Sequence, residues 1–377
     1  MNILMVQRFD LLNVSCARRI LAMARELVNR KHKVWIAHFP HPQRRKQIGS
    51  LFKHLPEGIQ YIELDRRGTS LPANRKKLYE AAHQADLVHL WKCYPDAAVP
   101  ALWAAFRRGL PVHYDWDDNE TGIAREMTGS KWICRIVSMW ERRTPRLVET
   151  VSVASQALKN KALSLGVPAE RIFDAPVGAD LSRFVPSAEE PRGGPHLVYV
   201  GQLEVASFAE MAVRAFAALA ERFPGSRLTI AGGGRKLDAV RALVNAFHLE
   251  ERVSLTGYIS ADAIPGILQQ SHIALAPFED NDITRCKSPL KIVEYLAAGL
   301  PVVASRVGEV PRMLEGCGLS VPPSDASALA MGVRQLMEHP ARRQEMRRAA
   351  RKRAEEIYNW PATVDNLEKA YKQARSM

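Results

Sequence analysis

Two series of short apolar strands, each strand followed by a helical pattern, most constrain what this chain can fold into. The first series has strands at residues 3–6, 32–37, 87–90, 111–114 and 150–153. The second has strands at residues 196–201, 227–234, 253–257, 273–277 and 301–304. Apolar runs that alternate with amphipathic helices predict parallel strands covered on both faces. We therefore expect an α/β protein with two doubly wound, Rossmann-like domains.

A segment rich in proline, glycine and charge separates the two series and is typical of a linker. At 377 residues the chain is also too long for one ordinary core. We predict a first domain over residues 1–186, a linker over 187–195, a second domain over 196–355 and a C-terminal helix over 356–377 that crosses back to the first domain. Ligands in open α/β sheets bind beyond the carboxyl ends of the strands, so the expected site is a cleft that the two domains face.

Residues 286–308 form the most distinctive segment of the second series. Ser288 can cap a helix whose first position suits Pro289, and Gly299 can end it. The unpaired N–H groups and the dipole at a helix N-terminus favour a phosphate. Cations stand close to this helix start in the sequence: Arg285, Lys287 and Lys291. The segment predicts an anion site with the carboxylate of Glu294 placed for ribose hydroxyls; a plain amphipathic helix before a buried strand is the alternative.

The segment resembles the nucleotide-binding signature of GT-B glycosyltransferases. Within them it is similar to a branch of the large retaining family four that reads Ser-Pro-x-Lys-x-x-Glu-Tyr. The family pattern has two glutamates, of which Glu294 matches the second and Cys286 replaces the first. The resemblance implies that the ribose contact is kept in this chain and that the carboxylate on the sugar side is missing.

Other landmarks extend the resemblance over nearly the whole chain. Residues 174–186 are similar to the family's entry to its linker, and residues 231–234 match its Gly-x-Gly turn beside the nucleotide. Tyr258 falls in the loop that lines the base pocket in the family. By this resemblance the predicted donor-binding residues are Gly201, Gly232, Gly234, Tyr258, Arg285, Lys287, Ser288, Pro289, Leu290, Lys291 and Glu294.

The two cations with which the family grips the donor diphosphate are absent. Where the family has Gly-Arg-Leu and a later Lys-Gly, this chain has Gln202 and then Ser207 and Phe208. Each missing charge-assisted hydrogen bond is worth ~1.5 to 3 kcal/mol. We expect the three cations around Ser288 to compensate from the other side of the phosphate.

Three carboxylates follow the strand at residues 111–114, namely Asp115, Asp117 and Asp118. The resemblance puts Asp117 at the place of the family's catalytic histidine. Carboxylates at a strand end can accept hydrogen bonds from sugar hydroxyls, and one with a raised pKa can act as a base. We predict that these three residues are catalytic; capping and turn aspartates are the structural alternative.

The spacing of Asp115 and Asp117 also matches the Asp-x-Asp metal site of GT-A glycosyltransferases, where Mn or Mg neutralises the donor diphosphate. That fold has one nucleotide-binding core, whereas this chain has two strand series. We therefore expect a metal-independent enzyme without a resident cofactor, whose donor is a nucleotide diphosphate sugar. A nicotinamide-dependent dehydrogenase is disfavoured, because no Gly-x-Gly-x-x-Gly opens a helix after either first strand.

The formal net charge of +13 indicates an anionic partner. Nucleic acid is disfavoured, because no zinc-finger spacing or aromatic-basic strand signature accompanies the charge. Large apolar and basic side chains interleave at helical spacing over residues 131–143: Trp132, Ile136, Met139, Trp140, Lys131, Arg135, Arg142 and Arg143. This pattern fits peripheral contact with an anionic membrane, and it also fits a half-buried core helix with a basic edge.

The cysteines and the apolar runs bear on the compartment. Five scattered cysteines without metal-ligand spacing predict free thiols, with neither a disulfide nor a zinc site: Cys16, Cys93, Cys134, Cys286 and Cys317. No run of eighteen or more apolar residues occurs, and the N-terminus enters a strand without a basic leader. We expect a cytoplasmic protein that at most lies at the inner face of the plasma membrane.

Together with the resemblance, these patterns predict a GT-B enzyme that transfers a hexose with retention of configuration. The donor would be a nucleotide diphosphate sugar and the acceptor a hydroxyl group on a glycan or lipid-linked molecule, in bacterial surface glycan or glycolipid assembly. The alternative is a catalytically silent GT-B subunit that binds a nucleotide or a glycan and scaffolds a partner. The cysteine at position 286 and the missing diphosphate cations motivate that alternative.

Overall fold

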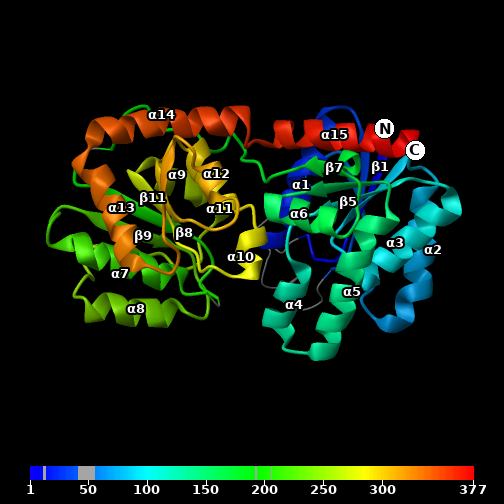
Figure 1. Cartoon of the computed structure of the whole chain (residues 1–377), viewed down its shortest axis with the longest axis horizontal. Coiled ribbons are helices and arrows are strands. Elements are labelled where there is room, and N and C mark those ends of the chain that lie inside the picture. The colour runs from blue at the N-terminus through cyan, green and yellow to red at the C-terminus, as the bar shows by residue number, and fades with distance from the viewer. Residues whose placement is uncertain (12–13, 41–55, 192, 205) are drawn as a thin grey trace. The chain divides into compact units, whose positions relative to one another are not determined.

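The computed structural model describes residues 1–11, 14–40, 56–191, 193–204 and 206–377, without the side chains of residues 14–16 and 68. The chain divides into two compact units. The first consists of residues 1–176 and 360–377, and the second of residues 177–359. Figure 1 shows each unit as a sheet covered by helices.

The first unit contains, among the described residues, a seven-stranded parallel sheet in the order β3-β2-β1-β4-β5-β6-β7. Its strands are β1 (Asn2–Gln7), β2 (Lys33–His38), β3 (Ile59–Glu63), β4 (Leu87–Trp91), β5 (Val112–Trp116), β6 (Thr150–Val153) and β7 (Ile172–Asp174). Its helices are α1 (Val14–Asn29), α2 (Leu71–Ala82), α3 (Pro95–Arg108), α4 (Glu120–Thr128), α5 (Lys131–Leu147), α6 (Gln156–Ser164) and α15 (Trp360–Ser376). The strand order reverses between β1 and β4, and such a reversal is where open α/β sheets bind ligands.

The second unit contains, in the part that the structure describes, a six-stranded parallel sheet in the order β10-β9-β8-β11-β12-β13. Its strands are β8 (His196–Val200), β9 (Arg227–Ala231), β10 (Val253–Leu255), β11 (Ile273–Ala276), β12 (Val302–Ser305) and β13 (Gly318–Val321). Its helices are α7 (Phe208–Ala220), α8 (Leu237–Ala246), α9 (Ile264–Gln269), α10 (Asp282–Cys286), α11 (Leu290–Ala297), α12 (Val310–Met313), α13 (Ala326–Glu338) and α14 (Pro340–Glu356). The core of this unit joins the sheet to α7, α8 and α13.

The boundary between the units lies before the expected linker. Residues 177–195 group with the second unit, because several of them are bonded to it. The N–H of Ala179 donates to the Tyr358 carbonyl at 2.9 Å. Within the expected linker, Arg343 of α14 donates to both carboxylate oxygens of Glu190, at 2.6 and 3.1 Å. The polar composition of this segment therefore serves contacts with α14 rather than a free connection.

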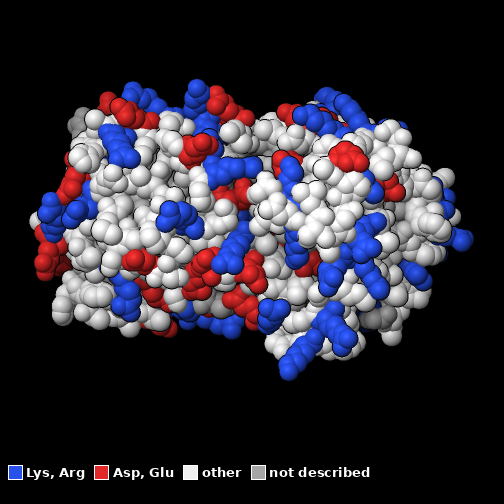
Figure 2. Space-filling view, in the orientation of Figure 1, with Lys and Arg blue, Asp and Glu red and all other residues white. Residues whose placement is uncertain are grey.

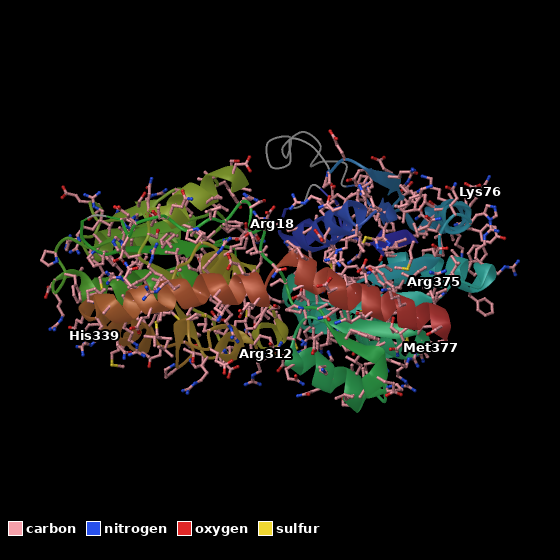
Figure 3. All side chains as sticks on the ribbon, turned by 90° about the horizontal axis from the view of Figure 1, so that it is seen from above. Arg18, Lys76, Arg312, His339, Arg375 and Met377 are labelled. Atoms are coloured by element: carbon pink, nitrogen blue, oxygen red, sulfur yellow. The ribbon has the colours of Figure 1, made fainter. Side chains whose placement is uncertain are left out.

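The C-terminal helix α15 belongs to the first unit. It begins at Trp360 rather than at residue 356, and it buries Leu367 and Tyr371. The Tyr371 hydroxyl pairs with Nδ1 of His89 on β4 at 2.7 Å, and the Thr150 hydroxyl on β6 donates to the Ala370 carbonyl at 3.3 Å. In Figure 3, His339 marks the beginning of α14, and Arg375 and Met377 mark the end of α15.

The described helices and cysteines add two observations. None of the helices in the described ranges is long and apolar enough to cross a membrane. Free thiols are found at Cys93, Cys134, Cys286 and Cys317, whereas Cys16 lies among the residues whose side chains are not described.

Candidate active site

The helix expected around Ser288 begins one residue later than predicted. Pro289 is its N-cap residue in an extended conformation, and no side chain among the described residues caps α11. The prediction that Ser288 caps this helix is wrong: its Oγ instead accepts a hydrogen bond from the Val177 N–H at 3.3 Å. Pro289 takes the capping position itself, and a proline side chain has no oxygen that could accept a hydrogen bond. The first-turn N–H groups, beginning at Leu290, thus lack a side-chain acceptor.

Lys291 lies in the first turn of α11, and aromatic rings surround its ammonium group. Nζ lies 4.2 Å from the ring centre of Tyr199, 5.8 Å from that of Phe278 and 6.0 Å from that of Phe208. Burial lowers the pKa of Lys291 to about 7, with the positive charge of Lys287 adding to this effect and Glu294 opposing it. No ion pair joins Lys291 to a carboxylate in the described part of the chain. The ammonium group is thus available to an anion from outside the protein.

Gly201 leaves room for this ammonium group. A Cβ atom at position 201 would lie 2.7 Å from Nζ of Lys291 and 2.8 Å from the hydroxyl of Tyr199. Gly201 directly follows β8, so it places the Lys291 ammonium at the carboxyl end of a central strand. Any larger residue at position 201 would have to push the lysine side chain away.

The glycine turn after β9 has a structural role in addition to the nucleotide contact, which stays a prediction. Gly232 and Gly234 have φ angles of +149° and +150°. A Cβ at Gly232 would lie 1.9 Å from the Gly201 carbonyl oxygen, and one at Gly234 would lie 2.4 Å from that of Leu203. The missing side chains therefore let the loops after β8 and β9 pack together, and Leu203 N–H donates to the Gly233 carbonyl there at 2.9 Å.

Tyr258 lies over this glycine turn. Its ring would be 2.7 Å from a Cβ at Gly233, and its hydroxyl donates to Oε1 of Glu204 at 2.9 Å. The side chain is 69% exposed, so one face of the ring is open to solvent. An open ring beside a glycine turn at the carboxyl ends of parallel strands can receive a flat group such as a nucleobase.

The three remaining charged residues of the predicted donor site differ in their availability. Glu294 is buried on α11, in the same helix as Lys291. Arg285 is exposed and already paired, since its Nε and Nη2 donate to the two carboxylate oxygens of Asp280 at 2.6 and 3.0 Å. Lys287 ends α10 and is partly exposed. Lys291 is thus better placed than Arg285 to neutralise a phosphate.

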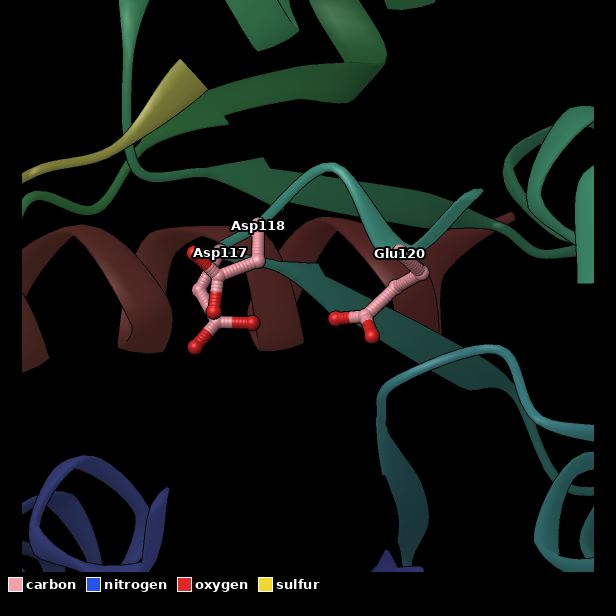
Figure 4. A group of neighbouring side chains, drawn as sticks. All are labelled: Asp117, Asp118 and Glu120. Atoms are coloured by element: carbon pink, nitrogen blue, oxygen red, sulfur yellow. The ribbon is translucent and has the colours of Figure 1, made fainter. Parts of the chain in front are cut away.

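In the first unit, one lysine forms ion pairs with three carboxylates that follow β5 in the sequence. Nζ of Lys92 lies 2.9 Å from Oδ1 of Asp117, 3.0 Å from Oδ2 of Asp118 and 2.5 Å from Oε1 of Glu120. Figure 4 shows the three acidic side chains: Asp117 and Asp118 come from the turn after β5, and Glu120 is the first residue of α4. Lys92 and Glu120 are buried, whereas Asp117 and Asp118 remain partly exposed. This carboxylate cluster is a polar site with an open side formed by the two aspartates.

Burial shifts the protonation of the carboxylate cluster. It raises the pKa of Glu120 to about 7, although the charge of Lys92 opposes the shift. Burial also raises the pKa of Asp117, and the neighbouring charge of Asp118 adds to the rise while Lys92 opposes it. A carboxylate with a raised pKa is a better proton acceptor than an ordinary one, so Asp117 is suited to act as a base.

Lys92 itself has a φ angle of +70°, which is uncommon for a residue with a side chain. It directly follows β4, so the unusual backbone conformation turns its side chain toward the carboxylate cluster. Neither Lys92 nor Glu120 was among the predicted site residues. The signal in the sequence was a single lysine after a buried strand, and sequence spacing alone does not connect it to residues 117–120.

Asp115, which the sequence predicts to be catalytic with Asp117 and Asp118, pairs with Arg19 rather than with Lys92, and its catalytic role stays a prediction. Asp115 lies within β5, is fully buried and accepts hydrogen bonds from Arg19 and from the Ser152 hydroxyl. Burial alone would raise its pKa, but the Arg19 guanidinium holds the pKa of Asp115 well below its usual value. Alternation along a strand would put residues 115 and 117 on the same face, but β5 ends at Trp116, and beyond that end the Asp117 carboxylate contacts Lys92 instead of Arg19.

A metal ion has oxygen ligands available in the carboxylate cluster. Carboxylate oxygens of Asp117, Asp118 and Glu120 lie within 4.8 Å of one another, which suits a divalent cation. The ammonium of Lys92 contacts all three of these carboxylates. An Asp-x-Asp metal site would need Asp115, which is bound to Arg19 instead.

Comparison with known proteins bears on both halves of the chain. Residues 16–178 match the family described as Glycosyl transferase 4-like domain, and residues 194–339 match the family described as Glycosyl transferases group 1. A glycogen synthase of Mycobacterium tuberculosis is 29% identical over 201 residues, which make up 52% of this chain and 47% of that protein. A GDP-mannose-dependent alpha-(1-6)-phosphatidylinositol dimannoside mannosyltransferase of the same species is 30% identical over 210 residues, 53% of this chain and 52% of that protein. The chain thus spans about half the length of the curated relatives it matches.

Solved structures share the fold over the whole chain. Sucrose-phosphate synthase from Thermosynechococcus elongatus superposes with a TM-score of 0.75 at 19% identity, covering 100% of this chain and 99% of that one. Anabaena Alr3699/HepE in complex with UDP gives a TM-score of 0.75 at 18% identity, covering 99% of this chain and 100% of that one. The prediction of two Rossmann-like domains in the GT-B arrangement of strands and helices is confirmed.

Proposed function

We propose that this chain, which consists of two glycosyltransferase domains with the GT-B fold, is a retaining hexosyltransferase that uses a nucleotide diphosphate sugar. The observation that carries the proposal is the ammonium of Lys291, which lies beside Gly201 and next to the uncapped start of α11 without an ion pair to a described carboxylate. Helix N–H groups and an unpaired cation together form a site for a diphosphate.

The donor is proposed to bind within the second unit. Lys291, with Lys287 beside it, replaces the two cations that the family places after its first strand in this domain. The N–H groups at Leu290 and Lys291 add hydrogen bonds to the phosphate, since no described side chain caps α11. Glu294 on the same helix accepts hydrogen bonds from the ribose, and the exposed ring of Tyr258 lies against the base. Asp280 already pairs with Arg285, so Arg285 contributes less.

The acceptor hydroxyl is proposed to bind in the first unit, at the partly exposed face of the carboxylate cluster. Asp117 accepts a hydrogen bond from the hydroxyl, and Lys92 holds Asp117 in place. With retention of configuration, the departing phosphate assists the removal of the acceptor proton. The rate then depends mainly on positioning and on neutralising the departing diphosphate.

The proposed reaction needs neither a metal ion nor a cofactor. Lys291 and the start of α11 supply positive charge for the diphosphate, and the Lys92 ammonium already contacts the three carboxylates that a metal ion would use. A divalent cation bound by Asp117, Asp118 and Glu120 would polarise an oxygen beside it, and it would compete with Lys92 for the same carboxylates.

The identities of donor and acceptor are proposed from the relatives. The similar proteins include the phosphatidylinositol dimannoside mannosyltransferase and a protein of Escherichia coli that is named for colanic acid biosynthesis. HepE is described in complex with UDP-glucose. These names support a hexose donor and a glycan or lipid-linked acceptor in surface glycan assembly, at the cytoplasmic face of the membrane. The Ser-Pro-x-Lys-x-x-Glu-Tyr motif supports membership of the retaining family four.

A second candidate is a catalytically silent subunit that binds a nucleotide or a glycan and scaffolds a partner. The observation that favours it is Cys286, whose buried thiol stands where the family has its sugar-side carboxylate. A thiol cannot accept the strong hydrogen bonds that a carboxylate accepts from sugar hydroxyls. Nucleotide binding without turnover would distinguish this candidate.

The test is an assay of purified protein with a panel of UDP- and GDP-hexoses, read as release of the free nucleoside diphosphate. An active enzyme is expected to hydrolyse at least one donor slowly and to release its diphosphate faster with a glycan or lipid-linked acceptor. The Lys287→Ala/Lys291→Ala variant should lose affinity for UDP or GDP far more than for the matching nucleoside, because only the diphosphate carries the charge. Tight nucleotide binding with no turnover of any donor would favour the silent subunit, and equal losses for diphosphate and nucleoside would remove the lysines from the site.

A further inference from the structure

The hairpin of α4 and α5 is a defined substructure of the first unit. The Asn119 side chain caps α4 by accepting from the Gly122 N–H at 3.1 Å, and the Ser130 side chain caps α5 by accepting from the Ile133 N–H at 3.4 Å. Gly129 joins them with a φ angle of +62°. A small apolar cluster of Tyr94, Ala124 and Val137 lies beneath the hairpin, packed by Phe9 and Cys134. The hairpin therefore has a fixed inner face and a fixed outer face.

The only acidic side chain of α5, that of Glu141, lies on the inner face of the helix. Glu141 is buried and accepts hydrogen bonds from the Glu120 N–H at 2.9 Å and from the Thr121 hydroxyl. Lys161 of α6 forms an ion pair with it at 3.2 Å. No negative charge of α5 therefore remains on its outer face.

The outer face of α5 carries five basic side chains, all exposed: Lys131, Arg135, Arg142, Arg143 and Arg146. None of these five forms an ion pair with another described residue. Figure 2 shows Lys and Arg side chains gathered over the hairpin. Arg351 on α14, by contrast, has Glu355 one turn away at 2.6 Å, so the five cations of α5 lack, among the described residues, the kind of partner that lowers the charge of such a helix face.

Large apolar side chains are exposed on both helices of the hairpin. Met127 at the end of α4 is 78% exposed, and Trp132 at the start of α5 is 72% exposed. Met139 and Leu147 continue the exposed apolar surface along α5. The positions 132, 136, 140 and 147 recur along one flank of the helix, and 131, 135, 142 and 146 recur along the other. We call this combined surface the hairpin face. It consists of Met127 on α4 and ten residues of α5: Lys131, Trp132, Arg135, Ile136, Met139, Trp140, Arg142, Arg143, Arg146 and Leu147.

We infer that the hairpin face docks on an anionic membrane surface, with Trp132 and Met127 at the boundary of headgroups and acyl chains and the five cations on lipid phosphates. A helix with a basic flank and an apolar flank lies in the plane of a bilayer interface, where lipid charge and acyl chains satisfy both. Nucleic acid would leave Met127, Met139 and Leu147 unused, since bases stack on aromatic rings. The inference specifies the surface for the membrane contact proposed above, and it does not depend on transfer activity.

The docking is tested by sedimentation with vesicles of phosphatidylcholine alone and of phosphatidylcholine mixed with phosphatidylglycerol. The wild-type protein is expected to sediment with the mixed vesicles and to be released from them by salt. The variants Met127→Ser/Trp132→Ser and Arg142→Gln/Arg143→Gln should each lower the vesicle partition coefficient about tenfold or more. Thermal unfolding and UDP or GDP binding should match the wild type in both variants, which separates lost docking from lost folding.

Matched control variants remove the same chemistry elsewhere. Phe106→Ser/Met331→Ser changes two other exposed apolar residues, which are 84% and 60% exposed, and should bind as the wild type does. Arg342→Gln/Arg348→Gln removes two exposed charges from α14 and should lower the partition coefficient by less than about threefold. Equal losses in the test and control variants would show a general charge effect and overturn the inference.

The depth of Trp132 gives an independent readout. Brominated lipids in the mixed vesicles should quench part of the tryptophan fluorescence of the wild-type protein, and the Trp132→Ser variant should lose that quenching. Sedimentation without any Trp132-dependent quenching would contradict the proposed orientation. Binding to polynucleotide but not to mixed vesicles would assign the hairpin face to nucleic acid and overturn the inference.

Discussion

Arg19 binds both carboxylate oxygens of Asp115, from Nε to Oδ2 and from Nη2 to Oδ1, at 2.8 Å each. Arg19 belongs to α1 and Asp115 to β5, so the pair joins a helix to the sheet that it covers. Both side chains are buried, and Nη2 of Arg19 also donates to the Ala175 carbonyl at 2.7 Å. Asp115 is therefore part of the scaffold of the first unit, two residues away from a carboxylate proposed for the reaction.

Asp115→Asn is expected to destabilise the first unit, because it leaves the buried guanidinium of Arg19 without its counter-charge. Breaking a buried ion pair from one side costs about 3 to 5 kcal/mol. Urea unfolding measures the loss in Asp115→Asn, and the Asp117→Asn variant serves as the neighbouring control. Asp117→Asn should change the free energy of unfolding by less than about 1.5 kcal/mol, since Lys92 keeps two other carboxylates. Equal stability losses would show that Asp115 has no special structural role.

Asp117→Asn should affect turnover more than donor binding. A base that acts mainly in the transition state changes the rate constant first, so kcat should fall about 10² to 10⁴-fold while the donor Kd stays within about twofold. Full activity is expected in excess EDTA. Loss of activity in EDTA that Mn or Mg restores would refute the metal-independent mechanism, and an Asp117→Asn enzyme with normal kcat would remove Asp117 from catalysis.

Glu294→Gln should weaken nucleotide binding and leave the fold intact. A carboxylate that accepts ribose hydrogen bonds is worth ~1.5 to 3 kcal/mol over a neutral amide, and glutamine keeps the shape of the side chain. Calorimetry with UDP and GDP measures the loss, and thermal unfolding serves as the control. An unchanged nucleotide affinity would place Glu294 outside the donor site.

Diphosphate binding should weaken as the pH rises above 7. The pKa of Lys291 in the free protein is about 7, so above this pH the ammonium must take up a proton before it can neutralise the phosphate. The affinity for UDP or GDP is expected to fall by up to about tenfold for each pH unit above 7. Lys291→Met should bind more weakly at neutral pH and show a flat profile from pH 7 to 9. A parallel decline in both proteins would assign the pH dependence to another group.

Acid should destabilise the first unit through His89. Burial lowers the pKa of His89 to about 4, below the value of roughly 6.5 for an unfolded histidine. Below pH 6.5 the unfolded chain binds a proton that the folded unit does not, so stability falls as the pH falls toward 4. The share of His89 is about 3 kcal/mol at about pH 4. Urea unfolding at about pH 6.5 and about pH 4 should show a smaller loss of unfolding free energy in His89→Gln than in the wild type. An equal loss in the two proteins would contradict the assignment to His89.

The sequence predicted best those elements whose apolar pattern is strong and local. The strands around residues 3–6, 87–90 and 196–201 are confirmed, because buried parallel strands are nearly continuous apolar runs. It did not predict the edge strands β3, β7 and β13, which are partly exposed and therefore carry polar residues.

The candidate site was predicted less completely, for a physical reason in each case. The carboxylate cluster depends on Lys92, which folding brings from another strand end and which no local pattern links to residues 117–120. The Ser288 hydroxyl accepts a hydrogen bond from the Val177 N–H, and the two residues lie 111 positions apart in the sequence, so no local pattern indicated this contact. The cation at Lys291 could be named from its motif, but its aromatic surroundings come from three separate segments. The roles of the donor residues stay predictions.

The position of α15 sets an order of events during synthesis of the chain. Residues 177–359 make up the second unit without interruption, so this unit has all its parts as soon as it has left the ribosome. The first unit is made earlier but must wait for residues 360–377, which bring Leu367 and Tyr371 to its sheet. Until then, the surface that α15 covers is exposed on an otherwise finished sheet, and His89 lacks the Tyr371 hydroxyl. The first unit is thus synthesised first but completed last. Premature termination after residue 359 would leave the second unit whole and would deprive the first unit of α15.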